Sequence, residues 1–106
     1  MIRRLGERWT IPILVALRGG GLRFAGVKKS LGGVSHRMLV RSLKNLERDG
    51  LVSRFEITGT PPQVSYSLTR LGEALLEEVD ALLRWQRDND PADCAARRLY
   101  DGRPSA

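Results

Sequence analysis

Four cationic side chains within residues 34–50 recur at the spacing of one helix face, and they are Arg37, Arg41, Lys44 and Arg48. At about 100° of rotation per residue they fall within roughly 60° of one another, with Val40 beside them. Guanidinium and ammonium groups neutralise phosphate, and an arginine can also hold guanine O6 and N7 together. The stretch therefore has the chemistry of a nucleic-acid contact. A solvated helix face is the competing interpretation for this helix taken alone.

A helix over residues 35–49 would position these cations. Ser35 is a favourable N-cap, and Gly50 is a usual helix stop. The apolar residues Leu39, Leu43 and Leu46 lie within about 40° of the first of them and form a narrow seam. The seam is almost opposite the cations, so burial of the seam would leave the basic face free to meet a ligand.

The neighbouring segments complete a DNA-reading unit. Upstream, residues 22–23 predict a short strand, and residues 23–33 predict a short helix closed by a glycine turn. A helix, a tight turn and a capped basic helix form the helix-turn-helix arrangement, whose second helix enters the DNA major groove. Downstream, residues 51–57 and 64–68 read as two strands around TGTPPQ. We interpret residues 54–66 as a wing.

These segments resemble the HxlR-type winged-helix transcriptional regulators of bacteria. The resemblance runs from about Gly6 to Trp85 and rests on GERWTIPILVAL, RFAGVKKSLGGVSHRMLVRSLKNLERDGLVSR and PPQVSYSLTRLGEALL. It implies a winged helix-turn-helix that binds DNA, with dimer contacts from the first helix. The family usually has a basic residue where this chain has Gln63 and a glutamate where it has Ser65, so the wing departs from the pattern. Many relatives sense oxidants through a cysteine ahead of the first helix; residues 1–5 hold none, so that mechanism does not carry over.

The charge distribution agrees with a polyanionic partner. The 106 residues carry a net charge of +6 and are enough for one domain with a modest core. Residues 1–72 hold 13 Lys and Arg against 4 Asp and Glu, whereas residues 73–106 hold 5 against 8. The positive charge thus belongs to the segment that contains the predicted reading helix and wing.

Other classes of function find little support in the residues. Cys94 is the only cysteine and His36 the only histidine, which excludes an intrachain disulfide and argues against a metal site. Paired carboxylates in an apolar setting and a glycine-rich phosphate loop are both missing, so we expect neither an enzyme nor a cofactor. We also expect a cytoplasmic protein, since there is no signal peptide and no apolar run of the roughly 20 residues that span a bilayer.

Two further helices predict a dimer. Pro12 allows the first helix either to begin with Thr10 as its N-cap or to be longer and kinked, and glycines 19–21 end it. The other helix begins after Thr69 as its N-cap and carries more apolar side chains than one seam needs. It should pack on its own domain and on a second copy, the alternative being a single well-buried helix. The predicted dimer contacts are Trp9, Leu14, Leu76, Val79, Leu83 and Trp85.

The sequence thus predicts an α+β, mainly helical fold: a winged helix-turn-helix with a two- to three-stranded antiparallel wing and a C-terminal dimerisation helix. Residues 1–88 should form this domain, and residues 89–106 an extension with a short helix capped by Asp90 and a frayed tail. The predicted function is sequence-specific binding of a homodimer to a double-stranded DNA operator with an inverted repeat. The alternative is a winged helix used only for protein contacts, which should lack the cation row. The candidate DNA-binding residues are Arg23, Ser35, His36, Arg37, Val40, Arg41, Lys44, Arg48, Arg54, Thr58, Thr60 and Gln63.

Overall fold

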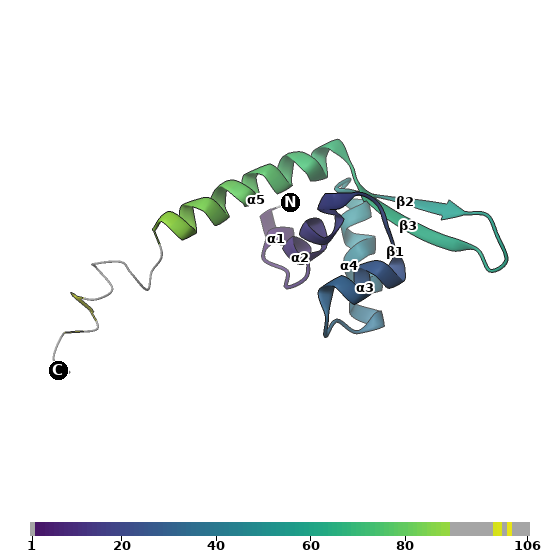
Figure 1. The fold of residues 1–106 in the computed structure, drawn as a ribbon, viewed down its shortest axis with the longest axis horizontal. Coiled ribbons are helices and arrows are strands. Elements are labelled where there is room, and N and C mark those ends of the chain that lie inside the picture. The colour runs from purple at the N-terminus through teal and green to yellow at the C-terminus, as the bar shows by residue number, and fades with distance from the viewer. Residues whose placement is uncertain (1, 90–98, 101, 103–106) are drawn as a thin grey trace. The chain divides into compact units, whose positions relative to one another are not determined.

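The computed structural model describes residues 2–89, 99, 100 and 102 (Figure 1). The chain groups into two compact units, residues 1–76 and 77–106, and each is considered by itself. The elements in chain order are α1 (Ile2–Leu5), α2 (Thr10–Ala16), the 3-10 helix η1 (Leu17–Gly19), β1 (Leu22–Arg23), α3 (Phe24–Leu31), α4 (His36–Arg48), β2 (Val52–Ile57), β3 (Gln63–Leu68) and α5 (Arg70–Asp88). The predicted domain boundary after residue 88 stays a prediction, and the predicted terminal helix after Asp90 lies outside the described residues.

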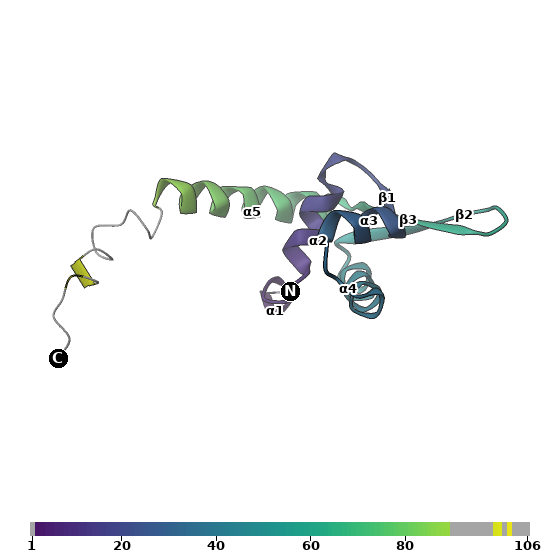
Figure 2. The ribbon, with the colours of Figure 1, turned by 60° about the horizontal axis from the view of Figure 1, so that its bottom comes forward.

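The three strands form one antiparallel sheet in the order β1-β3-β2. Figure 2 shows α4 lying on one side of the hairpin that β2 and β3 make. Arg54 pairs with Tyr66, and Glu56 pairs with Val64. Because directly paired residues of an antiparallel ladder share one face, these four side chains lie on the same face of the hairpin. The predicted bridging strand is confirmed, since Leu22 pairs with Tyr66.

The core of the first unit is apolar and is drawn from every helix-turn-helix element. Leu39, Leu43 and Leu46 of α4 are buried, as their spacing predicts. They share the core with Ile13, Leu14, Leu17, Val27, Leu51 and Val52. The apolar seam of α4 therefore faces inward, and its cationic face is turned away from the core.

The start of the first long helix differs from the prediction. Thr10 is the first helical residue rather than the N-cap; Trp9 holds the N-cap position and makes no side-chain capping bond. The Thr10 side chain is buried in the protomer, and its backbone N–H donates to the Glu7 carbonyl at 3.3 Å. Pro12 lies in the first turn, where backbone N–H groups have no acceptor within the helix, so proline costs no hydrogen bond there. The short helix α1 was not predicted.

Two caps fix the junction between α4, the sheet and α5. Gly50 has a φ of 78°, and the N–H groups of Gly50 and Leu51 donate to the Glu47 and Leu46 carbonyls at 3.0 Å each. This is a complete Schellman ending, which favours glycine because of the positive φ. Thr69 caps α5 as predicted: the Gly72 N–H donates to Thr69 Oγ1 at 3.0 Å. The Thr69 hydroxyl in turn donates to the Gly50 carbonyl at 2.6 Å, which ties the two helix ends together.

An ion pair joins α1 to the end of α4. Arg4 Nε lies 2.6 Å from Asp49 Oδ2, and Arg4 Nη1 lies 2.6 Å from Glu7 Oε1. The hydrogen bond from Arg4 lowers the pKa of the Asp49 carboxyl, and the positive charges of Arg4 and Arg48 lower it further. A carboxyl whose pKa is lower in the folded state contributes stability above its unfolded pKa, and this contribution is lost as the pH falls through the folded pKa.

We therefore expect Asp49→Asn to lower the free energy of unfolding by a similar amount at pH 7 and pH 5. The gap to the wild type should narrow only below about pH 3.8, the ordinary range of an aspartate. Urea unfolding at these pH values measures it. Glu7→Gln is the matched control and should cost less, because Glu7 is more exposed. A gap that stays constant down to pH 2.5 would contradict the assignment.

Candidate nucleic-acid interface

The exposed side of α4 carries a ridge of cations. Ser35 caps the helix as predicted, with the Met38 N–H donating to Ser35 Oγ at 3.1 Å. Beyond this cap the side chains of Arg37, Arg41, Lys44 and Arg48 are all exposed, and we call them the cation ridge. Within the described part of the chain, none of the four makes an ion pair. Their charges are therefore available to an external anion.

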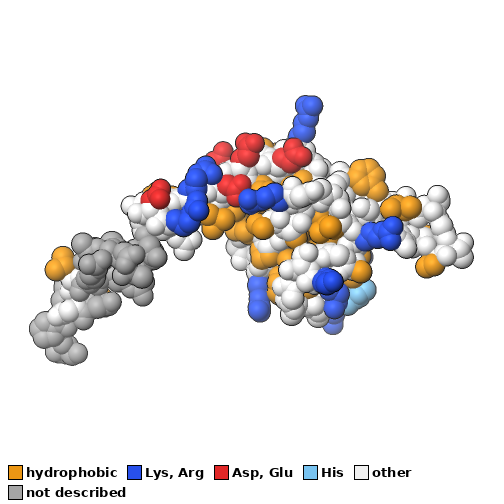
Figure 3. Space-filling model, in the orientation of Figure 1, with side chains coloured by type: hydrophobic (Ala, Val, Ile, Leu, Met, Phe, Trp, Pro, Cys, Tyr) orange, Lys and Arg blue, Asp and Glu red, His pale blue; other side chains and the backbone are white. Residues whose placement is uncertain are grey.

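The surface views agree with this distribution. In Figure 3, blue cationic side chains and the pale blue histidine lie over the region of α3 and α4, and the red acidic side chains lie over α5, with blue ones among them. His36 is the first residue of α4 and is exposed, with its ring centroid 4.8 Å from that of Phe24. An anion that approaches α4 thus meets the four cations of the ridge, and Glu47 is the exposed carboxylate on the same helix.

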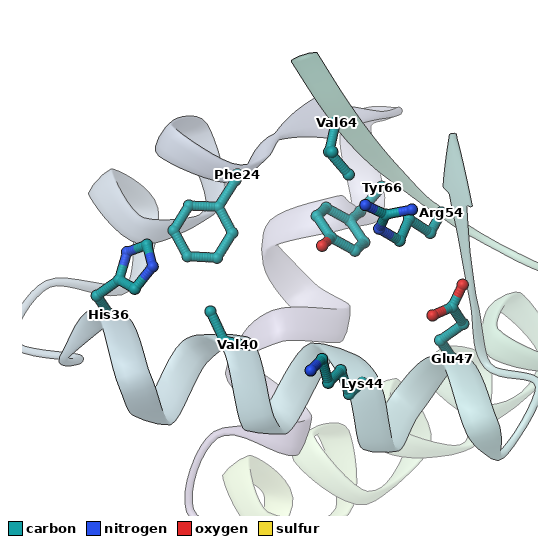
Figure 4. Close-up of a pocket in the computed structure, with 8 residues that line it drawn as sticks. All are labelled: Phe24, His36, Val40, Lys44, Glu47, Arg54, Val64 and Tyr66. Atoms are coloured by element: carbon teal, nitrogen blue, oxygen red, sulfur yellow. The ribbon is translucent and has the colours of Figure 1, made fainter. Parts of the chain in front are cut away.

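A hollow flanks the ridge on the side of the hairpin. Its walls are apolar and come from three elements, with Phe24 from α3, Val40 from α4, and Val64 and Tyr66 from β3. Figure 4 shows these side chains around a common space, with Lys44 at its lower rim. We call it the wing hollow. Val40, a predicted DNA contact, is half-buried and faces this space beside the ridge.

A second hollow flanks the ridge on the side of the N-terminal helices. It has a volume of about 290 Å³ and is lined by Arg8 and Trp9 together with Met38, Arg41 and Asn45 of α4. The Arg8 guanidinium carbon lies 5.1 Å from the centroid of the Trp9 ring, a cation–π distance. Trp9, a predicted dimer contact, is half-buried beside α4 in its own protomer.

The wing supplies one cation near the ridge. Arg54 lines the wing hollow together with Lys44, and its Nη1 lies 3.0 Å from Glu56 Oε1. Hydrogen bonds to Glu56 and Tyr66 raise the pKa of Arg54. The exposed Thr58 and Thr60 lie in the hairpin loop, between the two strands. Arg54 is therefore a wing cation that the structure brings to the same hollow as Lys44 of the ridge.

The remaining candidates lie along the sheet. Arg23 is exposed on β1, where it pairs with Ser65. Gln63 begins β3 and is half-buried, and its Oε1 has no hydrogen-bond partner among the described residues. Gln63 and Arg23 both line a shallow recess beside Phe24. A neutral, half-buried amide cannot replace the basic residue that the family pattern has at this position.

The predicted dimer contacts divide by exposure. The structure corrects the prediction at Leu14, whose side chain is fully buried in its own protomer and has no surface to offer a second copy. Leu76 and Val79 expose only 6% and 4%. Leu83 and Trp85 are exposed, as are Leu71 and Leu82 on the same helix. Sequence periodicity shows that the apolar set on α5 is wide, but not which of its two edges is covered.

Metal and membrane chemistry find no basis in the described part of the chain. No group of three His, Cys, Asp or Glu side chains there could hold a metal ion. None of the helices described is both long and apolar enough to cross a bilayer. The cation ridge and the wing are therefore the candidate functional surfaces of the described residues.

A buried-seam helix with a free basic face, preceded by a helix and turn and followed by a hairpin, defines a winged helix-turn-helix protein. The model of the HxlR-like helix-turn-helix family matches residues 4–93, and the chain belongs to this family. It is 44% identical over 97 residues to YtfH of Escherichia coli K12, which is named an uncharacterized HTH-type transcriptional regulator. The alignment covers 92% of this chain and 77% of YtfH.

Solved structures agree with the family. The chain is similar to YtfH from Salmonella typhimurium, with a TM-score of 0.76 and 43% identity over 92% of this chain and 87% of that one. It is also similar to the reduced form of the transcriptional regulator YodB from Bacillus subtilis, with a TM-score of 0.76 and 32% identity over 84% and 86% of the two chains. The protein is a transcriptional regulator of the helix-turn-helix type, and the predicted fold class is confirmed.

Proposed function

We propose that the protein binds double-stranded DNA in a sequence-specific manner, with α4 in the major groove and the wing of residues 54–66 near the DNA backbone or the minor groove. The observation that carries this proposal is the cation ridge: four exposed charges that make no ion pair with any described residue and lie almost opposite a buried seam. A winged helix that served only protein contacts would have no use for such a ridge, because interface cores are depleted of charged residues.

The ridge residues divide into two roles. Arg37 and Arg41 lie in the N-terminal half of α4, the part of a reading helix that meets base edges, and each guanidinium can bind guanine bidentately. Lys44 and Arg48, with Arg54 of the wing, are placed to neutralise phosphates, which supplies most of the affinity. Secondary contacts to the backbone come from Arg23, Ser35, His36, Thr58, Thr60 and Gln63.

We further propose that the chain acts as a homodimer on an inverted repeat, with residues 1–88 as the functional domain. Leu71, Leu82 and Trp85 expose 51%, 65% and 64% of their surface and lie within about 60° of one another around α5. Such an exposed apolar stripe supports pairing with a second copy. Leu83 is also exposed and lies about 100° from Leu82 around the helix. Two reading helices would then lie about 34 Å apart, so half-site centres should be about 10 bp apart or a multiple of one turn.

Selection of bound fragments from a random DNA library tests the proposal. Fragments enriched by the wild-type chain should share an inverted repeat, and enrichment should vanish when Arg37, Arg41, Lys44 and Arg48 are all replaced by alanine. The matched control replaces four cations elsewhere, Arg3, Arg18, Arg70 and Arg84, which keeps the same net charge. If both quadruple variants lose enrichment equally, total charge and not the ridge governs binding.

Single substitutions should separate the two roles. Arg41→Ala should weaken specific binding by about 1–3 kcal/mol and relax the preference at one base position. Lys44→Ala should weaken binding to all sequences similarly and reduce the salt dependence by about one counterion. Affinities for the selected operator and for its single-base variants, measured at several salt concentrations, check both. An unchanged base preference in Arg41→Ala would count against its base contact.

A further inference from the structure

The wing hollow has the size and lining of a small-molecule site. Its volume is about 440 Å³, within the roughly 300–1,000 Å³ of ligand pockets. Phe24, Val40, Val64 and Tyr66 give it apolar walls from α3, α4 and β3 (Figure 4). All of these residues belong to the first compact unit, so the hollow lies within one unit. It can receive a flat apolar group between the reading helix and the wing.

Charge in the wing hollow is concentrated at Lys44. Three charged side chains reach the hollow, Lys44, Glu47 and Arg54. Arg54 pairs with Glu56 at 3.0 Å, and in Figure 4 the Glu47 carboxylate points toward Arg54. Lys44 makes no ion pair within the part of the chain that the structure describes. Among the described residues, the hollow therefore offers Lys44 beside an apolar wall, with the His36 ring next to Phe24 and a carboxylate farther along α4.

We propose that the wing hollow binds a small aromatic carboxylate with a single negative charge, as an effector that competes with DNA. The aromatic ring would lie against Phe24 and Val64, and the carboxylate would pair with Lys44. Glu47 would repel a second negative charge, which restricts the ligand to a monoanion. The regulatory part of this proposal depends on the proposed function, whereas ligand binding itself does not.

Competition follows from the place of Lys44. A carboxylate on Lys44 neutralises a member of the cation ridge, so a DNA phosphate can no longer pair with that lysine. DNA and the ligand must then lower each other's affinity by the same factor, because coupling between two binding equilibria is reciprocal. A probe of about 13 non-hydrogen atoms in a half-open site should bind with a Kd on the order of 0.1–1 mM.

Titration of the full ¹⁵N-labelled chain with 2-naphthoate tests the binding step, with the uncharged 2-naphthamide as a matched probe at constant ionic strength. Amide signals of Val40, Lys44, Val64 and Tyr66 should shift with naphthoate, and the amide should bind at least tenfold more weakly. Lys44→Met should reduce naphthoate to the affinity of the amide. Equal affinity of the two probes, or shifts confined to other regions, would overturn the proposal.

Variants of Val64 test the site without removing a cation. Val64→Phe should fill the hollow and weaken naphthoate at least tenfold, while affinity for the selected operator stays within about threefold. Val64→Leu fills less of the hollow and adds no polar group. It replaces Val64→Phe in this test if phenylalanine perturbs the fold. Naphthoate should lower operator affinity of the wild type but not of Val64→Phe. An equal effect on both would place the ligand elsewhere and refute the proposal.

If the wild type binds no DNA, the proposed function fails, and the titration alone still decides whether the hollow binds the acid.

Discussion

Replacing Gly72 with alanine should lower the free energy of unfolding by about 3 kcal/mol. A Cβ at Gly72 would overlap the Leu51 carbonyl oxygen and would lie 3.1 Å from its carbon and 3.3 Å from Leu68 Cδ2. The carbonyl cannot turn away cheaply, because it accepts a hydrogen bond from the Thr69 N–H at 3.1 Å. Backbone atoms must therefore move at the junction that joins the end of α4 to the start of α5. This cost exceeds the gain of about 1 kcal/mol that alanine brings to a helix.

Gly26→Ala is the matched control, since Gly26 also lies inside a helix. A Cβ there would meet only Leu22 side-chain atoms, at 3.6 and 3.7 Å, which is ordinary contact. The variant should be neutral or more stable by up to about 1 kcal/mol. Urea unfolding measures both variants. Equal stability of Gly72→Ala and the wild type would show that α5 does not approach Leu51 as closely as the structure has it.

Replacing Leu82 with glutamate should abolish the homodimer and weaken operator binding at least about 100-fold. Leu82 is 65% exposed on α5, so the change should leave the protomer folded. In a dimer the same side chain would be covered, and an unpaired carboxylate there would be desolvated. A monomer loses the second half-site, so the affinity for an inverted repeat falls toward that of a single reading helix.

Arg84→Gln changes the net charge by the same amount at an exposed position that lies outside the stripe, about 160° around the helix from Leu82. It should leave the dimer and its operator affinity within a few-fold of the wild type. Sedimentation and operator titration at matched concentrations compare the two variants. A wild-type chain that is monomeric at micromolar concentration yet binds one half-site with full affinity would contradict the proposed dimer.

Local patterns predicted most of the fold. The seam of Leu39, Leu43 and Leu46 and the Ser35 and Thr69 caps depend on neighbours a few residues away, and the structure confirms them. The periodicity of apolar residues is enough to predict the buried side chains of an element that has a single buried side.

Features that depend on distant residues were missed. Arg4 and Asp49 are 45 positions apart, and no local pattern pairs them. Leu14 was misplaced because an apolar helix residue reads the same whether it meets its own core or a second copy. The wing hollow needs three elements to meet, so Phe24 and Tyr66 carried no signal beyond ordinary core residues. The need for glycine at position 72 likewise arises from the approach of Leu51.

Methylation protection of guanine N7 by dimethyl sulfate tests the central claim most directly, because N7 lies in the major groove. On the selected operator, the wild type should protect guanines in two patches about one helical turn, or a multiple of a turn, apart. Arg41→Ala should lose protection at one guanine in each patch at saturating protein, while Lys44→Ala should keep every protected position. Saturated binding without N7 protection, or protection unchanged by Arg41→Ala, would contradict the placement of α4 and its arginine in the major groove.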